Sequence, residues 1–397
     1  MTTRYRGRIA LVHDSLNSYG GAERVALEIA RALKELGFSI DLYVIERTDW
    51  ERVKRLTSYG PDVIDREHVI PLPRLPPLIY RNYIVWLVRD VISTNIIKKK
   101  YDVVITTKQS AVPVLSDVIY MHFPDFIPHL RYLYYPHVYS RILPRVYLKP
   151  AYLFSNALIA LFRFMTYNPL VLTNSRFSAA VIKRFLGVKP VVLYPPVEVE
   201  RYLPFAESKR RRNIVLTISR IELSKGLELI PEIAMSARRA KFVVVGALAS
   251  PDYLRSLRLR IRALNLQDRV MVVPDLSEGL KLELMKKAKV YLHPMRYEHF
   301  GIAVVEAMAA RLVPVVHKSG GPWTDIVEMG RYGRGFSDAQ EAAGAIEELL
   351  SLDESKLDEL RVRAVSKAKT FDFKHFKNSL YTVIDHFLRQ INEGLNS

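Results

Sequence analysis

The chain has 397 residues, and its 59 Lys and Arg against 41 Asp and Glu give a formal net charge of +18 at pH 7. It is 49% hydrophobic and 25% charged, which are ordinary fractions for a globular protein and argue against disorder. It contains no cysteine, which excludes disulfides, a thiolate nucleophile and cysteine-ligated zinc or iron–sulfur centres. The length exceeds one compact domain and predicts two domains of about 100–200 residues each.

Short apolar runs rich in β-branched residues alternate with helical patterns along the whole chain. The first series of predicted strands comprises residues 9–12, 40–45, 103–106, 118–122, 171–173 and 191–194. The second series comprises residues 214–218, 242–245, 270–273, 290–293 and 313–317. Continuous apolar strands separated by helices are typical of parallel sheets that are covered on both faces.

Helical periodicity is clearest in residues 21–37. The apolar face of this predicted helix consists of Ala26, Ile29, Ala30 and Leu33. The residues expected to face solvent are Glu28, Arg31, Lys34 and Glu35. Gly37 stands where a C-terminal cap is expected, and two further helices are predicted at residues 354–369 and 373–392.

Paired prolines mark the expected domain linker. Pro195 and Pro196, followed by the charged stretch 198–213, separate the two series of strands. The expected fold class is therefore α/β, with two doubly wound, Rossmann-like domains at residues 1–197 and 198–372. In such sheets ligands bind at the carboxyl ends of the strands, so the loops directly after the strands should carry the functional residues.

The best candidate for a membrane span is the segment 151–172, which contains Arg163 and Pro169. A central arginine opposes insertion by about 2.5 kcal/mol or more, so we interpret this segment as non-spanning. The apolar run 9–12 is too short for a signal peptide. We therefore expect a cytoplasmic protein that is peripheral on the cytoplasmic face of a membrane.

Charge is distributed unevenly along the chain. No acidic residue occurs between Asp125 and Glu198, and basic and aromatic side chains interleave in this stretch. The segment 71–100 is similarly apolar and aromatic, and it ends in three lysines. Basic residues attract anionic headgroups and aromatic residues settle at the interface, so an anionic membrane surface is a predicted partner. The alternative interpretation is a solvated basic surface over an ordinary hydrophobic core. A nucleic-acid-binding groove is the least favoured interpretation, because no RNA- or DNA-binding motif accompanies these residues.

Two glycine pairs follow predicted strands. Gly20 and Gly21 open a helix after the first strand, and Gly320 and Gly321 follow the strand at 313–317. Glycines let backbone amides approach an oxyanion, and a helix N-terminus favours negative charge. The first pair lacks the full dinucleotide pattern G-x-G-x-x-G, so it does not indicate an NAD site.

Two cations, Arg220 and Lys225, follow the strand at 214–218 and stand five residues apart. Such a pair on a loop that enters a helix is suited to neutralise a diphosphate. Taken alone, the pattern is better explained by exposed surface cations, which are common.

The strongest pattern follows the strand at 290–293. Glu298 lies in the loop and Glu306 lies on the helix that is expected to begin near Gly301. Ionised carboxylates accept hydrogen bonds from vicinal sugar hydroxyls, and first-turn amides of a helix are free to bind phosphate. The first-turn amides are those of Phe300, Gly301 and Ile302. The pattern predicts a ligand with both hydroxyl and phosphate groups.

In their order along the chain, these motifs resemble retaining GT-B glycosyltransferases of family GT4. The sequence from Glu298 to Glu306, together with residues 317–322 and Asp325, is similar to that of the Alg11-type lipid-linked-oligosaccharide mannosyltransferases. Residues 20–25, 120–124 and 173–177 resemble the same subgroup. Arg311, by contrast, stands where the family commonly has glycine.

The resemblance implies two domains that face a central cleft, with the acceptor bound by residues 1–197 and the nucleotide sugar by residues 198–372. The C-terminal helix, 373–397, would pack back on the first domain. Gly20 and Gly21 would line the acceptor side, and His122 would point into the cleft as a catalytic candidate. No metal and no other cofactor are expected.

The resemblance also implies roles in the second domain. Arg220 and Lys225 would hold the donor diphosphate as catalytic cations, and Glu306 would bind the ribose hydroxyls. Glu298 would hold the transferred sugar near its reacting carbon and is a further catalytic candidate. The amides of the first turn and of the second glycine pair would contact sugar or phosphate. The favoured reaction moves mannose from GDP-mannose onto a polyprenyl- or dolichyl-diphosphate-linked glycan or another membrane glycolipid.

Three alternatives stay open from the sequence. The first is a transferase that uses a UDP- or ADP-sugar and a soluble acceptor. The second is a sugar-nucleotide hydrolase or epimerase. The third is a non-catalytic protein that binds lipid or nucleic acid through its basic surface.

Overall fold

The computed structural model describes residues 7–17, 20–57, 59–70, 93–107, 116–127, 130, 133–134, 148–165, 169–204 and 211–394. Much of the two basic, aromatic segments that the sequence singles out, at 71–100 and between Asp125 and Glu198, lies outside these residues. The site residues that the sequence predicts all lie within them.

The chain divides into two compact units. Unit 1 comprises Met1–Leu133, Leu143–Pro196 and Phe373–Ser397, and unit 2 comprises Tyr134–Ile142 and Val197–Asp372. The division after Pro196 falls one residue before the boundary expected from the sequence. The last helix, α15 (Phe373–Gly394), belongs to unit 1 although it follows unit 2 in the chain.

Unit 1 is built on a parallel 7-stranded sheet with the order β3-β2-β1-β4-β5-β6-β7. Its strands are β1 (Arg8–Val12), β2 (Ser39–Val44), β3 (Arg66–Val69), β4 (Val103–Thr106), β5 (Val118–Met121), β6 (Leu170–Thr173) and β7 (Val191–Val192). Every strand of the predicted first series is present. The prediction missed β3, an edge strand with the sequence Arg-Glu-His-Val, because it has no apolar run.

The described helices of unit 1 flank this sheet. They are α1 (Gly21–Glu35), α2 (Trp50–Leu56), α6 (Leu148–Met165), α7 (Arg176–Leu186) and α15. Gly37 has a φ of +100°, a left-handed conformation that ends α1 where the sequence predicts its cap. None of the helices in the described part of the chain has both the length and the apolar character needed to span a bilayer.

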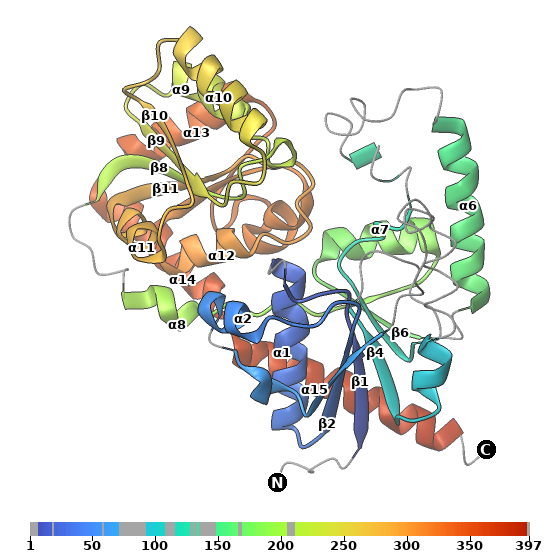
Figure 1. Cartoon of the computed structure of the whole chain (residues 1–397). Coiled ribbons are helices and arrows are strands. Elements are labelled where there is room, and N and C mark those ends of the chain that lie inside the picture. The colour runs from blue at the N-terminus through green and yellow to red at the C-terminus, as the bar shows by residue number, and fades with distance from the viewer. Residues whose placement is uncertain are drawn as a thin grey trace. The chain divides into compact units, whose positions relative to one another are not determined.

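Glu28 corrects one expectation about α1. It was expected to face solvent, but only 1% of it is exposed. Helix α15 lies beside α1 in Figure 1, and its Phe376, Leu380 and Ile384 join the core that α1 forms with the sheet. The carboxylate of Glu28 lies 3.8 Å from Arg31, whose guanidinium packs on the ring of Phe373. Glu28 also hydrogen-bonds to Tyr59. The local pattern fails here because the partners on this side of α1 come from other parts of the chain.

Unit 2 is built on a parallel 6-stranded sheet with the order β10-β9-β8-β11-β12-β13. Its strands are β8 (Arg212–Ile218), β9 (Lys241–Gly246), β10 (Val270–Pro274), β11 (Ala288–His293), β12 (Val313–His317) and β13 (Arg334–Phe336). The second predicted series is confirmed, and the prediction missed only β13, a three-residue edge strand. The helices are α8 (Val199–Tyr202), α9 (Leu229–Ser236), α10 (Pro251–Ala263), α11 (Glu278–Lys287), α12 (Ile302–Ala309), α13 (Ala339–Ser351) and α14 (Glu354–Lys369).

Both sheets therefore have the doubly wound topology that the sequence predicts. The strand order reverses between β1 and β4 in unit 1, and between β8 and β11 in unit 2. In open parallel sheets ligands bind outside the carboxyl ends of the strands at such a reversal. The topology thus directs attention to the loops after these four strands.

Candidate functional site

The loops after β8, β11 and β12 carry the predicted donor residues of unit 2. These three strands are neighbours in the middle of the sheet, so their carboxyl ends lie side by side. Lys225 ends a short 3-10 turn after β8, Glu298 lies in the loop after β11, and Gly320 and Gly321 follow β12. The strand order brings together residues that are about a hundred positions apart in the sequence.

Glu298 is the centre of this cluster. Its Oε2 lies 3.2 Å from Nζ of Lys225 and 3.6 Å from Nε2 of His293. Its Oε1 accepts a hydrogen bond from the backbone amide of His299 at 3.2 Å. The Nζ of Lys225 also lies 3.2 Å from the sulfur of Met295. Both carboxylate oxygens of Glu298 are therefore engaged by groups of its own unit.

The environment of Glu298 keeps it ionised. Burial alone would raise the pKa of its carboxyl, but the positive charge of Lys225 and the nearby His293 outweigh burial and hold the pKa well below its usual value of 4.5. An ionised carboxylate is an acceptor only, so Glu298 is suited to bind hydroxyl groups or cations and not to donate a proton.

Arg220 is placed differently from Lys225. Its guanidinium lies 3.0 Å from a carboxylate oxygen of Glu222, and its side chain is 63% exposed. Ser224 donates a hydrogen bond to the same Glu222 oxygen at 2.8 Å. The two predicted cations thus share a loop but have different partners, and Lys225 is the one in contact with Glu298.

Glu306 lies on α12 and is half-buried. The fully buried Tyr291 of β11 links it to Glu298 electrostatically: burial raises the pKa of the Tyr291 phenol, and the charges of Glu306 and then Glu298 raise it further. The Tyr291 hydroxyl donates to the carbonyl of Ile218 at 3.1 Å. The charges of both predicted carboxylates therefore act on one buried ring.

The start of α12 and the loop after β12 meet at the backbone of Glu298. Gly301 is the N-terminal cap of α12 with a φ of +100°, so Gly301 and Ile302 stand at the helix start as predicted. The Gly321 amide donates to the Glu298 carbonyl at 2.8 Å. A Cβ on Gly320 would lie 2.3 Å from that same carbonyl oxygen. This close approach alone requires glycine here, whatever the loop binds.

In unit 1 the predicted residues also follow strands. His122 is buried directly after β5, with its ring centroid 4.8 Å from that of Tyr120. Gly20 precedes α1, and its amide donates to the Glu23 carboxylate at 2.7 Å, which caps the helix. His13, at the end of β1, lies 2.8 Å from the hydroxyl of Thr107 after β4, at the reversal of strand order.

Sequence reasoning assigned no role to His293. It is the last residue of β11, only 4% exposed, and it faces Glu298. The available signal was its position, because a polar residue that ends an otherwise apolar central strand stands at the edge where such sheets bind ligands.

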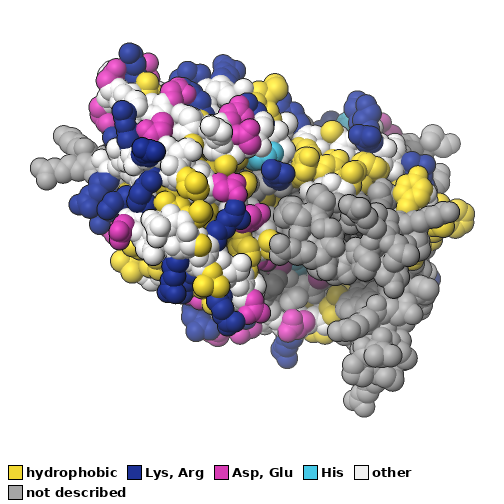
Figure 2. Space-filling view, turned by 90° about the horizontal axis from the view of Figure 1, so that it is seen from above, with side chains coloured by type: hydrophobic (Ala, Val, Ile, Leu, Met, Phe, Trp, Pro, Cys, Tyr) yellow, Lys and Arg dark blue, Asp and Glu magenta, His cyan; other side chains and the backbone are white. Residues whose placement is uncertain are grey.

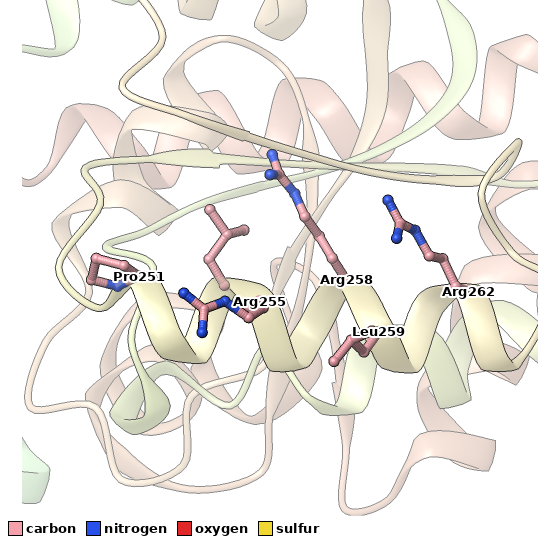
Figure 3. Close-up of a pocket in the computed structure, with 6 residues that line it drawn as sticks. Pro251, Arg255, Arg258, Leu259 and Arg262 are labelled. Carbon is pink, nitrogen blue, oxygen red and sulfur yellow. The ribbon is translucent and has the colours of Figure 1, made fainter.

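A hollow of about 310 Å³ elsewhere in unit 2 is separate from this cluster. It is lined by Pro251, Leu254, Arg255, Arg258, Leu259 and Arg262. Figure 3 shows that these residues follow one helix, α10, and none of them belongs to the loops after β8, β11 or β12. Among the described residues no group of three or more His, Asp and Glu is arranged to hold a metal ion.

Comparisons with known proteins identify the domain families that the chain matches. Residues 19–201 match the domain family described as Glycosyltransferase Family 4, and residues 200–371 match that described as Glycosyl transferases group 1. The GDP-Man:Man(3)GlcNAc(2)-PP-Dol alpha-1,2-mannosyltransferase of Neurospora crassa is 36% identical over an alignment of 242 positions, which covers 52% of this chain and 43% of that protein. The chain thus spans less than half the length of this relative.

Two further similarities extend over most of the chain. The Alpha-1,3/1,6-mannosyltransferase ALG2 of Debaryomyces hansenii is 25% identical over an alignment of 386 positions, which covers 81% of this chain and 76% of that protein. The crystal structure of Anabaena Alr3699/HepE in complex with UDP and glucose has a TM-score of 0.70 at 18% identity, and the match covers 96% of this chain and all of that one. The structural similarity shows a shared fold.

Proposed function

The chain belongs to the family 4 glycosyltransferases and has their GT-B fold, and from this premise we propose that it transfers mannose from GDP-mannose to a lipid-linked glycan with retained anomeric configuration. The proposal draws its sugar and acceptor from the names of the mannosyltransferase relatives in Neurospora crassa and Debaryomyces hansenii.

The observation that supports the donor site best is the contact between Lys225 and Glu298 at the carboxyl ends of the two strands where the sheet order reverses. A nucleotide sugar presents a diphosphate beside a hydroxyl-rich ring, so it needs a cation and an ionised acceptor side by side. Lys225 and Glu298 offer this pair, and the low pKa of Glu298 keeps its carboxylate charged at neutral pH.

In the proposed mechanism, negative charge grows on the departing nucleoside diphosphate as the glycosidic bond breaks. Lys225 and Arg220 stabilise that charge, together with the amides of Phe300, Gly301 and Ile302 at the helix start and of Gly320. The Gly321 amide is already engaged by the Glu298 carbonyl, so Gly321 contributes by holding the loop in place. Preorganised charge of this kind is usually the largest catalytic contribution. Because these groups supply the positive potential, the proposed site uses no metal, and activity should persist in EDTA.

The remaining assignments concern recognition. Glu298 would accept hydrogen bonds from the transferred sugar, and Glu306 from the ribose hydroxyls. In unit 1, Gly20, Gly21 and His122 follow strands of the 7-stranded sheet and would serve the acceptor.

A lipid-linked acceptor implies that the protein works at a membrane surface, and we propose peripheral attachment on the cytoplasmic face through α6. This helix buries Leu158 and Phe162 but leaves Leu153 and Phe164 60% and 88% exposed. No acidic residue occurs from 126 to 197, so the surroundings of α6 favour anionic lipid. Figure 2 shows Lys and Arg side chains spread over the described surface, in keeping with the net charge of +18.

Donor specificity is tested by thermal unfolding with GDP-mannose, GDP, UDP and ADP, followed by transfer to a polyprenyl-diphosphate-linked glycan. A ligand at a hundred times its dissociation constant stabilises by about 2.7 kcal/mol, which raises Tm by roughly 5–10 °C. We expect this rise with GDP and GDP-mannose. A larger rise with UDP would refute the choice of donor, and no rise with any nucleotide would refute the site.

The role of Glu306 is tested with Glu306→Gln. The variant should lose much of the stabilisation by GDP, because the ribose hydroxyls exchange a charged acceptor with two oxygens for a neutral amide with one acceptor oxygen and a donor. Glu283→Gln is the matched control, since Glu283 is an exposed residue of α11 that pairs only with Lys286 among the described contacts. Equal behaviour of the two variants would contradict the assignment.

Membrane attachment is tested by co-sedimentation with anionic vesicles at low salt. Leu153→Ser with Phe164→Ser should weaken binding about tenfold or more, because two large apolar side chains no longer enter the interface. Leu259→Ser, an equally exposed leucine on α10, is the control. Unchanged sedimentation of the α6 variant would exclude this helix as the attachment site.

A further inference from the structure

His293 and Lys225 approach the same oxygen of Glu298. Lys225 Nζ lies 3.2 Å from Oε2, and His293 Nε2 lies 3.6 Å from it. The other oxygen, Oε1, is taken by the amide of His299 at 3.2 Å. Glu298 therefore has three groups around two oxygens, and two of the three compete for Oε2.

The proposed function makes a second demand on Lys225, because the same ammonium has to bind the donor diphosphate. A lysine that turns toward phosphate shares or gives up its contact with Oε2. The Glu298 side chain is only 18% exposed, so water does not readily replace the lost partner. A buried acceptor left without a donor is penalised by about 1–3 kcal/mol, which would favour movement of the carboxylate away from its position.

We propose that His293 is a positioning residue that holds Glu298 Oε2 in place while Lys225 engages the diphosphate. The inference rests on the proposed function and adds a residue to that site. A separation of 3.6 Å is longer than a hydrogen bond, and a shift of about 0.6 Å converts it into one. Such tightening is common when an active site receives its substrate.

The surroundings of His293 suit this role. It ends β11, so its backbone is fixed by pairing with β12, where His293 lies opposite Val316. Its ring lies roughly parallel to that of Tyr291, with an interplanar angle of 23°. Only 4% of His293 is exposed, so its imidazole is enclosed by its neighbours, and Nε2 is the ring atom within 3.6 Å of Glu298. A buried donor that is fixed on a strand can hold a carboxylate carried by a loop.

Two polar variants test which nitrogen acts. The side-chain amide of His293→Gln reaches the place of Nε2, whereas that of His293→Asn reaches only the place of Nδ1. We expect His293→Gln to retain most of the transfer rate from GDP-mannose, and His293→Asn to lower kcat/KM about tenfold to a hundredfold. Both variants keep a polar group at a buried position, and thermal unfolding without ligand shows whether each is folded.

The readout that separates positioning from general damage is affinity for GDP compared with transfer of mannose. GDP has no sugar for Glu298 to hold, so both variants should bind GDP within about twofold of the wild type. A double-mutant cycle with Glu298→Ala completes the test: once Glu298 is gone, His293→Asn should cause no further loss. If His293→Asn transfers mannose as fast as the wild type, or if the losses in the cycle are additive, the role of His293 is wrong and the proposed function is unaffected.

The outcome for the proposed function is read from the wild type in the same experiment. A wild-type chain that binds neither GDP nor GDP-mannose overturns the proposed function and the role of His293 with it. A wild-type chain that transfers mannose, with a normal His293→Asn variant, leaves the proposed function standing and removes only His293.

Discussion

Replacing Gly321 with alanine tests whether the site depends on the contact between the loop after β12 and the backbone of Glu298. Gly321 has φ −60° and ψ −39°, a helical conformation that alanine adopts without strain. Any loss must therefore come from the added methyl group. Its Cβ would lie 2.3 Å from the carbonyl oxygen of His299 and 2.9 Å from Cα of Phe300.

The expected magnitude follows from these contacts. Both clashing atoms belong to the backbone, so no rotamer change relieves them, and overpacking of this kind is destabilising by about 1–3 kcal/mol. Movement of the loop also weakens the hydrogen bond from the Gly321 amide to the Glu298 carbonyl, worth about 1 kcal/mol. The higher helix propensity of alanine offsets up to about 1 kcal/mol. We expect a net loss of about 2 kcal/mol, or a Tm lower by roughly 4–8 °C.

The assay is thermal unfolding, with GDP-mannose binding measured on the folded protein. Gly344→Ala is the matched control, because Gly344 lies in α13 with no other heavy atom within 4 Å of an added Cβ, so its variant should be as stable as the wild type or more so. Because Glu298 would move with its loop, Gly321→Ala should also bind GDP-mannose more weakly. If Gly321→Ala has the same Tm as Gly344→Ala and binds GDP-mannose like the wild type, the inferred dependence on this backbone contact is wrong.

Three further outcomes are expected. Lys225→Met should lower the free energy of unfolding by roughly 2 kcal/mol at pH 7. The pKa of Glu298 is depressed in the folded protein, so the stabilisation by the Lys225 contact is present above pH 4.5 and is lost as the pH falls through the folded-state pKa. The difference in Tm between the variant and the wild type should therefore close in acid. Arg311→Gly should raise Tm slightly. Arg311 has a φ of +62°, a left-handed conformation that is unfavourable by about 1–2 kcal/mol for a residue other than glycine, and this gain exceeds the loss of a half-exposed ion pair with Asp358. Asp358→Asn removes the ion pair alone and should lower Tm. Phe376→Ala should destabilise unit 1 by about 3–5 kcal/mol, because the buried ring of Phe376 joins α15 to the core. The expected result is faster proteolysis near α15, and unchanged proteolysis would contradict the packing of α15 on unit 1.

The alternation of apolar runs and helical patterns predicted both sheets, because a strand buried on two faces must be apolar throughout its length. Edge strands escape this constraint. β3 and β13 carry polar or short sequences, and only their pairing with β2 and β12 makes them strands. Local sequence cannot report such pairing, since the partner supplies the stabilisation.

Glu28 shows the same limit for burial. The period of α1 correctly separated an apolar face from a polar one, but a helix has more than two neighbours in a folded domain. Because α15 returns from the other end of the chain, part of the polar face is covered, and Arg31 neutralises the charge that becomes buried. No window of sequence around residue 28 contains that information.

For the site, the sequence by itself determined which residues follow strands: Glu298 and Glu306 around a helix start, Lys225 after β8, and a glycine pair after β12. That much is local, because strand, loop and helix signals lie within a few residues of each motif. Tertiary structure decided which cation meets the carboxylate, pairing Glu298 with Lys225 and leaving Arg220 with Glu222, and it brought His293 to the same oxygen. These choices depend on loop paths and on the order of strands in the sheet, and distances of a few ångströms between residues some 70 positions apart are fixed only when the sheet has formed.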